Sequence, residues 1–182
     1  MKKLLFIGIL CTITATSFAQ FKFKGVGGGL SFGSNAAISS SGEAMGVGIE
    51  VNALAQIIEK VDAEAALIIY LPSSVGDFKQ QITTFNANGH YNFFSQDKFT
   101  AYGLAGLNFT FGKYETNVHG YDFGWHSVHG SKYSENISEV GLNIGAGGAY
   151  AFTDKLDGTA QLGYTLGDAD QLFINLGVMY KF

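Results

Sequence analysis

The chain is poor in cysteine and in charged residues, and it has no long apolar run. Cys11 is the only cysteine among 182 residues. It lies in an N-terminal segment that we expect to be removed, so no thiol remains for a disulfide, a zinc–thiolate site or a nucleophile. No later stretch approaches 18 consecutive apolar residues, which excludes a helical membrane protein. The net charge of −4 argues against a nucleic-acid partner, which would require a basic patch.

The N-terminus has the pattern of a secretory signal peptide. Lys2 and Lys3 form a positive region, residues 4–10 are apolar, and small residues precede the expected cleavage site after Ala19. A membrane anchor is the alternative, but the apolar run is too short to span about 30 Å of hydrocarbon. We therefore expect a signal peptide over residues 1–19 and one domain over residues 20–182.

Glycine and aromatic residues are abundant, and apolar residues alternate with others toward the C-terminus. The chain has 25 Gly, 16 Phe and 9 Tyr, which suits a barrel that meets lipid outside and packs side chains inside. Strict alternation makes one face of a β-strand oily and the other mixed. Read backward, the oily face carries Phe182, Tyr180, Val178, Leu176, Ile174 and Leu172, and the other face carries Lys181, Met179, Gly177, Asn175, Phe173 and Gln171.

The same alternation predicts an all-β fold of eight strands, each near the length that crosses a bilayer at a tilt. Short connections alternate with longer ones, which is typical of periplasmic turns and outer loops, and an even strand number places both termini in the periplasm. The predicted strands cover residues 23–33, 44–57, 61–71, 82–94, 99–112, 138–152, 156–166 and 171–182, with short connections at 59–60, 95–98 and 153–155 and longer ones at 34–43, 72–81 and 113–137.

Outward aromatic residues gather near the predicted strand ends, as in the interfacial girdles of membrane barrels. A soluble all-β barrel or sandwich also has one apolar face. It would, however, fill its interior with large apolar side chains, whereas the inward positions here carry Asn, Thr, Asp and Glu. The pattern therefore favours a membrane barrel. The girdle residues are Phe93, Phe99, Phe109, Phe111, Tyr150, Phe152, Tyr164, Tyr180 and Phe182.

Several charged residues fall on the inward face by strand parity. They could form a cation path or an acid–base site. We favour a plug of paired side chains, because an eight-stranded barrel is only wide enough for side chains to fill and buried charges require partners. A hairpin turn at residues 168–170 would place Asp157 opposite Lys181, as an ion pair. Glycines at 27–29 blur the first strand, whose inward face stays undetermined. The inward charged residues are Glu50, Asp62, Glu64, His90, Glu139, Asp157 and Lys181.

The predicted loop 113–137 holds three of the four histidines. His126 and His129 could share a zinc or copper ion with His119 or Asp122, since imidazole suits both metals. The spacing matches no standard metal site. We therefore predict no metal site in this segment.

The same segment contains the dipeptide His126-Ser127 and several large aromatic residues. A serine hydrolase needs a histidine that an acidic residue orients, and here the pair lies in a predicted loop. We favour recognition of a surface partner, because loops on a rigid scaffold usually carry function and Tyr and Trp are preferred contact residues. These aromatics are Tyr114, Tyr121, Trp125 and Tyr133.

Over its whole expected mature length the chain resembles the small eight-stranded outer-membrane barrels, the OmpA/OmpX-like outer membrane protein β-barrel domain group. The similarity lies in the signal peptide, the strand number, the asymmetry of turns and loops, and the C-terminal strand FINLGVMYKF. It implies contact with outer-membrane lipid or lipopolysaccharide and recognition of strand 171–182 by the barrel-assembly machinery. Members are surface or structural proteins, adhesins and, in a few cases, lipid-modifying enzymes. Fold alone does not choose among these.

We expect a non-enzymatic outer-membrane barrel with an envelope-structural role, or with a surface-interaction role through residues 113–137 and an unidentified ligand. We predict no catalytic residue, no cofactor and no metal. The alternatives are a narrow, porin-like channel for ions or solutes, a lipid-A-modifying enzyme, and a soluble ligand-binding barrel.

Overall fold

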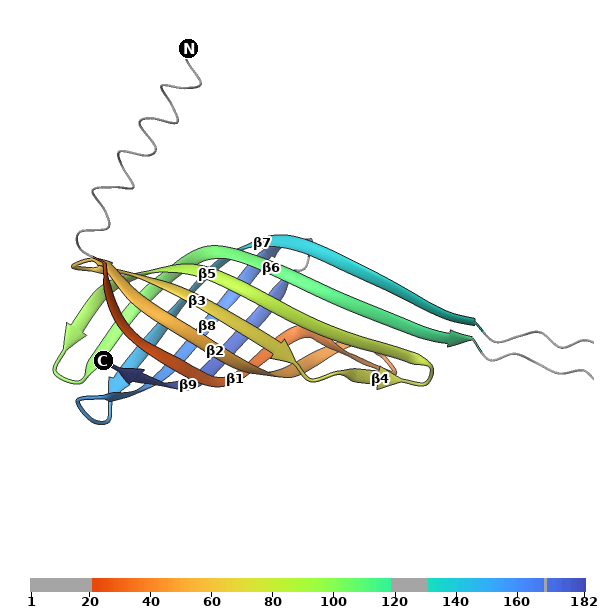
Figure 1. Ribbon diagram of the computed structural model, residues 1–182, viewed down its shortest axis with the longest axis horizontal. Coiled ribbons are helices and arrows are strands. Elements are labelled where there is room, and N and C mark those ends of the chain that lie inside the picture. Colours follow the sequence, from red (N-terminus) through yellow and green to blue (C-terminus); the bar gives the residue numbers. More distant parts are fainter. Residues whose placement is uncertain (1–20, 119–130, 169) are drawn as a thin grey trace, which may run out of the picture.

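The computed structural model describes residues 21–118, 131–168 and 170–182, and nearly all of them lie in β-strands (Figure 1). None of these residues belongs to a helix long and apolar enough to cross a membrane. The predicted signal peptide, residues 1–19, lies outside the described residues. The strands are β1 (Lys22–Ser39), β2 (Gly42–Ile58), β3 (Val61–Tyr70), β4 (Ser73–Val75), β5 (Phe78–Gln96), β6 (Phe99–Val118), β7 (Ser131–Ala151), β8 (Leu156–Gly167) and β9 (Gln171–Lys181).

The strands pair antiparallel and the sheet closes on itself. Neighbours follow the order β3-β2-β1-β9-β8-β7-β6-β5, and β3 also pairs with β5, which completes the ring. β4 pairs with β5 alone, so it prolongs the β3 wall strand at one end of the barrel. The predicted eight-stranded antiparallel up-and-down barrel is confirmed. Closure leaves no unpaired edge in the wall of the barrel, which is the condition for a sheet to cross lipid.

Alternate residues of each wall strand face outward and inward. On β3, Leu67 and Ile69 are exposed while Glu64, Ile68 and Tyr70 are buried. β5 and β9 alternate in the same way. The predicted faces of the C-terminal strand and the predicted inward positions of Asp62, Glu64 and His90 are therefore confirmed. The predicted girdle aromatics are exposed or partly exposed. This outer surface is an apolar band of the kind that meets lipid.

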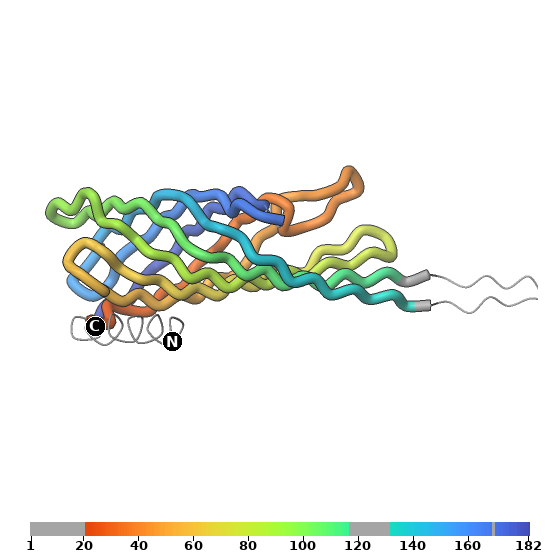
Figure 2. Tube along the Cα trace, turned by 90° about the horizontal axis from the view of Figure 1, so that it is seen from above, coloured from red at the N-terminus to blue at the C-terminus, as the bar shows by residue number. Residues whose placement is uncertain are grey.

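The two ends of the barrel differ in length and shape. Both described termini lie at the end with the tight turns, where the Phe182 amide donates a hydrogen bond to the Lys24 carbonyl at 3.0 Å. At the other end the paired strands continue as hairpins, of which β6–β7 projects furthest (Figure 2). Short turns on one side and long connections on the other are typical of outer-membrane barrels, so we assign the tight turns to the periplasm and the hairpins to the exterior.

The outer connections are hairpins of paired strand where the sequence predicts loops. β6 continues to Val118 and β7 starts at Ser131, with a continuous ladder between them. The prediction of a loop over 113–137 is therefore wrong for the described residues. The predicted loops 34–43 and 72–81 are likewise largely replaced, by the β1–β2 and β4–β5 hairpins. Each predicted strand stopped where apolar alternation stopped, but backbone ladders do not require apolar side chains, and Tyr, Thr and Val favour strands.

Candidate functional site

Amide and hydroxyl side chains fill the middle of the barrel. Asn143 on β7 donates hydrogen bonds to the Oδ1 atoms of Asn86 and Asn88, both at 3.0 Å. Asn108 donates to Asn86, and Thr165 donates to Asn143, each at 2.7 Å. All five side chains are buried. Because each is hydrogen-bonded, the cost of removing it from water is largely offset, and the network ties four strands together.

Glu64 is the centre of a neighbouring buried cluster that connects opposite walls. Its carboxylate accepts hydrogen bonds from Asn88 and Gln161, both at 3.0 Å, and lies 3.2 Å from His90 Nε2. β3 and β8 lie directly across the ring from each other, so the bond between Glu64 and Gln161 spans the lumen. The Tyr102 ring stacks on His90 with centroids 4.3 Å apart. Side chains therefore cross the lumen at this level, as expected for eight strands, and they also line a hollow of about 80 Å³.

Gly147 makes room for the Tyr102 ring. A Cβ atom at this position would lie 2.6 Å from the ring, closer than packed atoms approach. Tyr102 also accepts a hydrogen bond from Gln161 at 3.2 Å. A side chain at position 147 would therefore displace the ring that covers His90.

Ion pairs line the periplasmic mouth of the barrel. Lys24 Nζ lies 2.8 Å from Asp62 Oδ2, and Lys181 Nζ lies 2.7 Å from Asp157 Oδ1. The predicted ion pair between Asp157 and Lys181 is confirmed, but the predicted register is wrong, because Asp157 lies opposite Met179. The β8–β9 ladder ends with Thr165 opposite Gln171, so the turn is centred one residue earlier than predicted. A lysine two residues along the facing strand still reaches the carboxylate.

Glu50 differs in its partners from Asp62, Glu64 and Asp157, the other inward carboxylates of the periplasmic half of the barrel. Its side chain is buried, with only 4% of the residue exposed. Asn52 donates a hydrogen bond to it at 2.8 Å, and no cation among the described residues forms an ion pair with it. By contrast, Glu64 contacts His90, and Asp62 and Asp157 each have a lysine.

The plug is the set of buried or partly buried side chains described so far. The His90 and Glu64 side chains are 3% and 2% exposed, and amide partners surround the carboxylate. An acid–base site must reach a substrate, whereas these groups are enclosed and bound to one another. Their arrangement is that of a cross-link between strands. The plug comprises Asn86, Asn88, Asn108, Asn143, Thr165, Glu64, His90, Tyr102, Gln161, Lys24, Asp62, Asp157, Lys181, Glu50 and Asn52.

At the exterior end the hairpins surround two adjoining hollows, which together we call the outer mouth. The inner hollow, of about 200 Å³, has Ile82 and Thr110 among its lining residues. The outer hollow, of about 380 Å³, is lined by apolar side chains and by polar ones that include Gln80 and Lys79. The hollows share Asn35, Glu43 and Tyr114 as lining residues. The carboxylates of the inner hollow are Glu43, Glu139, Asp168 and Asp170.

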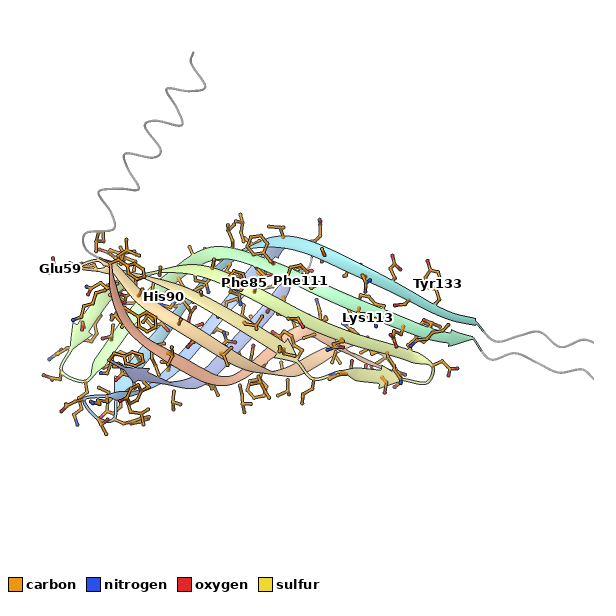
Figure 3. The ribbon with its side chains drawn as sticks, in the orientation of Figure 1. Glu59, Phe85, His90, Phe111, Lys113 and Tyr133 are labelled. Atoms are coloured by element: carbon orange, nitrogen blue, oxygen red, sulfur yellow. The ribbon has the colours of Figure 1, made fainter. Side chains whose placement is uncertain are left out.

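The projecting β6–β7 hairpin has one charged face beyond the apolar band. Glu115 lies 2.7 Å from Lys113 Nζ and 2.9 Å from Lys132 Nζ. Hydrogen bonds from these two lysines lower the pKa of Glu115 to about 2. Tyr114 and Tyr133 alternate with these residues along their strands and so belong to the other face. Figure 3 shows Lys113 and Tyr133 on this hairpin, far from His90.

Tyr114 stands where the projecting hairpin meets the outer mouth. Burial raises the pKa of its hydroxyl, and the nearby carboxylates of Glu139 and Glu43 raise it further. Inward Glu139 therefore belongs to the outer mouth and is separate from the plug. Strand parity shows only that Glu139 faces inward, and does not distinguish the mouth from the plug.

The residues behind the metal and hydrolase interpretations lie outside the described residues. This applies to His119, Asp122, His126, Ser127 and His129. Within residues 21–118, 131–168 and 170–182, no group of three or more His, Cys, Asp or Glu side chains is placed to hold a metal ion.

Sequence reasoning missed Lys24 and Gln80. Lys24 precedes the glycine run of β1, where alternation gives no signal, and only the folded barrel brings it to Asp62. Gln80 lay inside a predicted loop. Extending the parity of β5 backward from inward Thr84 and Ile82 would have placed it on the inward face, where it is buried.

Comparisons with known proteins agree on the fold. The family model "Outer membrane protein beta-barrel domain" matches residues 5–182. A comparison with curated protein sequences gives no match.

Solved structures of small outer-membrane barrels resemble this one at low sequence identity. The Neisserial surface protein A, NspA, is 20% identical with a TM-score of 0.63, covering 87% of this chain and 97% of that chain. The attachment invasion locus protein Ail of Yersinia pestis is 15% identical with a TM-score of 0.58, covering 88% and 99%. The N-terminal β-barrel domain of Pseudomonas aeruginosa OprF is 18% identical with a TM-score of 0.56, covering 90% and 100%.

At these sequence identities the structural similarity shows the fold alone, whereas the family model covers nearly the whole sequence. The lipid-compatible band, the closed ring and the long exterior hairpins agree with it. The chain belongs to the outer membrane protein beta-barrel domain family, and its location is the outer membrane.

Proposed function

We propose that this barrel is a non-enzymatic surface-interaction protein whose exterior hairpins, chiefly residues 113–137, contact an unidentified ligand. The observation that carries the proposal is the contrast between a filled lumen and a projecting hairpin. Gln161 bonds to Glu64 across the barrel, while β6 and β7 stay paired beyond the apolar band. A rigid scaffold that holds out a long exterior element suits contact with something outside the cell.

We propose two further partners, one for the apolar outer surface of the barrel and one for its C-terminal strand. Outer-membrane lipid or lipopolysaccharide covers the band of exposed apolar side chains. Strand 171–182, with its exposed Tyr180 and Phe182, is the segment that the barrel-assembly machinery reads. The names of Ail and NspA refer to attachment and to the surface, which is consistent with an exterior role here.

Removing the projecting hairpin tests the proposal. Glu115–Ser134 are replaced by Asn-Gly, which closes the ladder after the pair Tyr114↔Glu135 with a favoured two-residue turn. We expect the barrel to fold and its whole-cell adhesion or binding profile to change. The matched control replaces the periplasmic turn Glu59-Lys60 by Asn-Gly and leaves the profile unchanged. Equal profiles for both variants would leave only an envelope-structural role.

The channel alternative has its own measurement. Because side chains span the lumen at the level of Glu64, we expect no large, stable conductance from the purified protein in a planar bilayer. A reproducible conductance would favour the narrow, porin-like channel.

The lipid-A-modifying alternative depends on His126 and Ser127. Incubation of the protein with lipopolysaccharide, followed by mass analysis of the acyl chains, tests it. We expect the acyl chains to be unchanged.

A further inference from the structure

The outer mouth has an excess of carboxylates over cations. Glu43, Glu139, Asp168 and Asp170 line the inner hollow, and no Lys, Arg or His is among its lining residues. Within the described part of the chain, none of these four forms an ion pair. Carboxylates that share a concave site make the potential there negative and favour a cationic ligand.

Lysines of the exterior end do little to balance this charge. Lys113 and Lys132 both pair with Glu115 on the projecting hairpin, outside the mouth. Lys79 is the remaining lysine of the described exterior segments, and it lines the outer hollow only. The inner hollow therefore keeps its negative charge.

Gln80 provides an independent sign of a ligand. Only 4% of this residue is exposed, and it lines the outer hollow. Its amide nitrogen donates to the Asn35 carbonyl at 3.5 Å, whereas its Oε1 atom has no hydrogen-bond partner. A buried acceptor of this kind is costly unless a donor reaches it, and the outer hollow is the space that lies beside this side chain.

The outer hollow also has apolar and aromatic lining residues, beside the polar Ser39 and Lys79 and the shared Asn35 and Glu43. Ile38, Val75 and Phe78 come from three different strands, and Tyr114 stands between the two hollows. The face of an aromatic ring attracts a cation, and it also packs against apolar groups. The mouth thus combines an acidic inner part, an aromatic side chain at the junction and an outer part to which three strands contribute apolar side chains.

We propose that the outer mouth binds a protonated amine carried on an apolar body. The ammonium group lies among Glu43 and Glu139, and its body packs on Phe78 and Val75. Gln80 Oε1 accepts an N–H hydrogen bond from the ligand. This proposal rests on the proposed function, which places ligand recognition at the exterior end of the barrel. It adds that the ligand is an organic cation. The amine comes either from a free small molecule or from a lysine side chain of a peptide.

The ligand class differs from that in one structural neighbour. Ail has a structure in complex with the heparin analogue sucrose octasulfate, which is a polyanion. The carboxylates of the outer mouth would repel such a ligand. Sucrose octasulfate therefore serves as a probe of opposite charge in the same experiment.

Binding is measured on the purified full barrel in nanodiscs by backbone amide shifts at Gln80 and Tyr114. The probes are phenethylamine, its neutral counterpart 2-phenylethanol, and a short peptide with one lysine. We expect phenethylamine to bind about tenfold more tightly than 2-phenylethanol, and added salt to weaken it. Tighter binding of the peptide than of phenethylamine identifies a protein partner, and the reverse order identifies a small amine.

The double variant Glu43→Gln/Glu139→Gln should lower phenethylamine affinity about tenfold. Gln80→Met should lower it less, through loss of one acceptor. Glu59→Gln, in the periplasmic turn, is the matched control and should leave affinity unchanged. All variants are checked for folding by heat-modifiable gel mobility.

Equal affinity for phenethylamine and 2-phenylethanol would overturn the proposal. So would an unchanged affinity in the double variant, or preferential binding of sucrose octasulfate. Failure of this ligand class is distinguishable from failure of the proposed function, because the hairpin deletion reports cell-surface binding without reference to any amine.

Discussion

The plug and the outer mouth both carry inward carboxylates, but the surroundings of these groups differ. In the periplasmic half, Asp62 lies 2.8 Å from Lys24, Asp157 lies 2.7 Å from Lys181, and Glu64 contacts His90. In the mouth, Glu43 and Glu139 face an open hollow and pair with no cation of the described chain. Charges enclosed in a barrel are costly unless they are paired, and of these plug carboxylates only Glu50 has no cation among the described residues. Carboxylates at an open mouth, by contrast, stay hydrated. We therefore expect the first region to contribute to stability, and we propose recognition for the second.

The largest expected effect follows from breaking the central buried pair. Glu64→Ala leaves His90, Asn88 and Gln161 without their common acceptor, so we expect the free energy of unfolding to fall by about 3–5 kcal/mol. Urea titration in lipid vesicles, followed by circular dichroism, measures it. Glu59→Ala, an exposed residue of the periplasmic turn, is the control and should change it by less than about 0.5 kcal/mol. A loss below about 1 kcal/mol for Glu64→Ala would show that the plug is not a stabilising element.

A smaller loss is expected when the plug is overpacked. Gly147→Ala places a methyl group 2.6 Å from the Tyr102 ring, so we expect a loss of about 1–3 kcal/mol in the same titration. Gly103→Ala is the matched control, because a Cβ atom at position 103 would meet nothing within 4 Å, and it should cost nothing. Equal stabilities of the two variants would contradict the close packing of the ring.

Substitution of Glu50 tests whether a buried carboxylate inside the barrel requires a cationic partner. It is buried without a cation, so Glu50→Gln removes a charge and keeps the shape. We expect the free energy of unfolding to rise by about 1 kcal/mol. A fall of similar size would mean that the carboxylate has a partner that Gln cannot replace, and would remove the distinction between Glu50 and Glu64.

The smallest effect concerns the exterior charged face. Hydrogen bonds from Lys113 and Lys132 lower the pKa of Glu115 from 4.5 to about 2. A carboxyl group with a lowered folded-state pKa stabilises the fold above its unfolded pKa and loses that contribution as pH falls through the folded value. We therefore expect the protection of amides in the hairpin arms, measured relative to their intrinsic exchange rates at each pH, to fall between pH 4.5 and 2. Lys132→Gln should raise the Glu115 pKa in a carboxyl NMR titration, and no change would remove this lysine as a cause.

The alternation of apolar and polar residues is sufficient to predict the barrel, because lipid outside and packed polar side chains inside impose a period of two on every wall strand. The number of strands and the inward positions of Glu64 and His90 follow from that period. The ion pair of Asp157 with Lys181 was predicted from a turn that the structure centres one residue earlier. Tertiary structure decided how far the strands extend, because ladder pairing continues where apolar alternation ends. It also decided which distant residues meet: Lys24 and Asp62 are 38 positions apart and Glu64 and Gln161 are 97 apart. Such meetings depend on ring closure and strand register, which alternation along one strand does not encode. The acidic mouth arises in the same way, since its carboxylates come from three hairpins that only the closed barrel brings together.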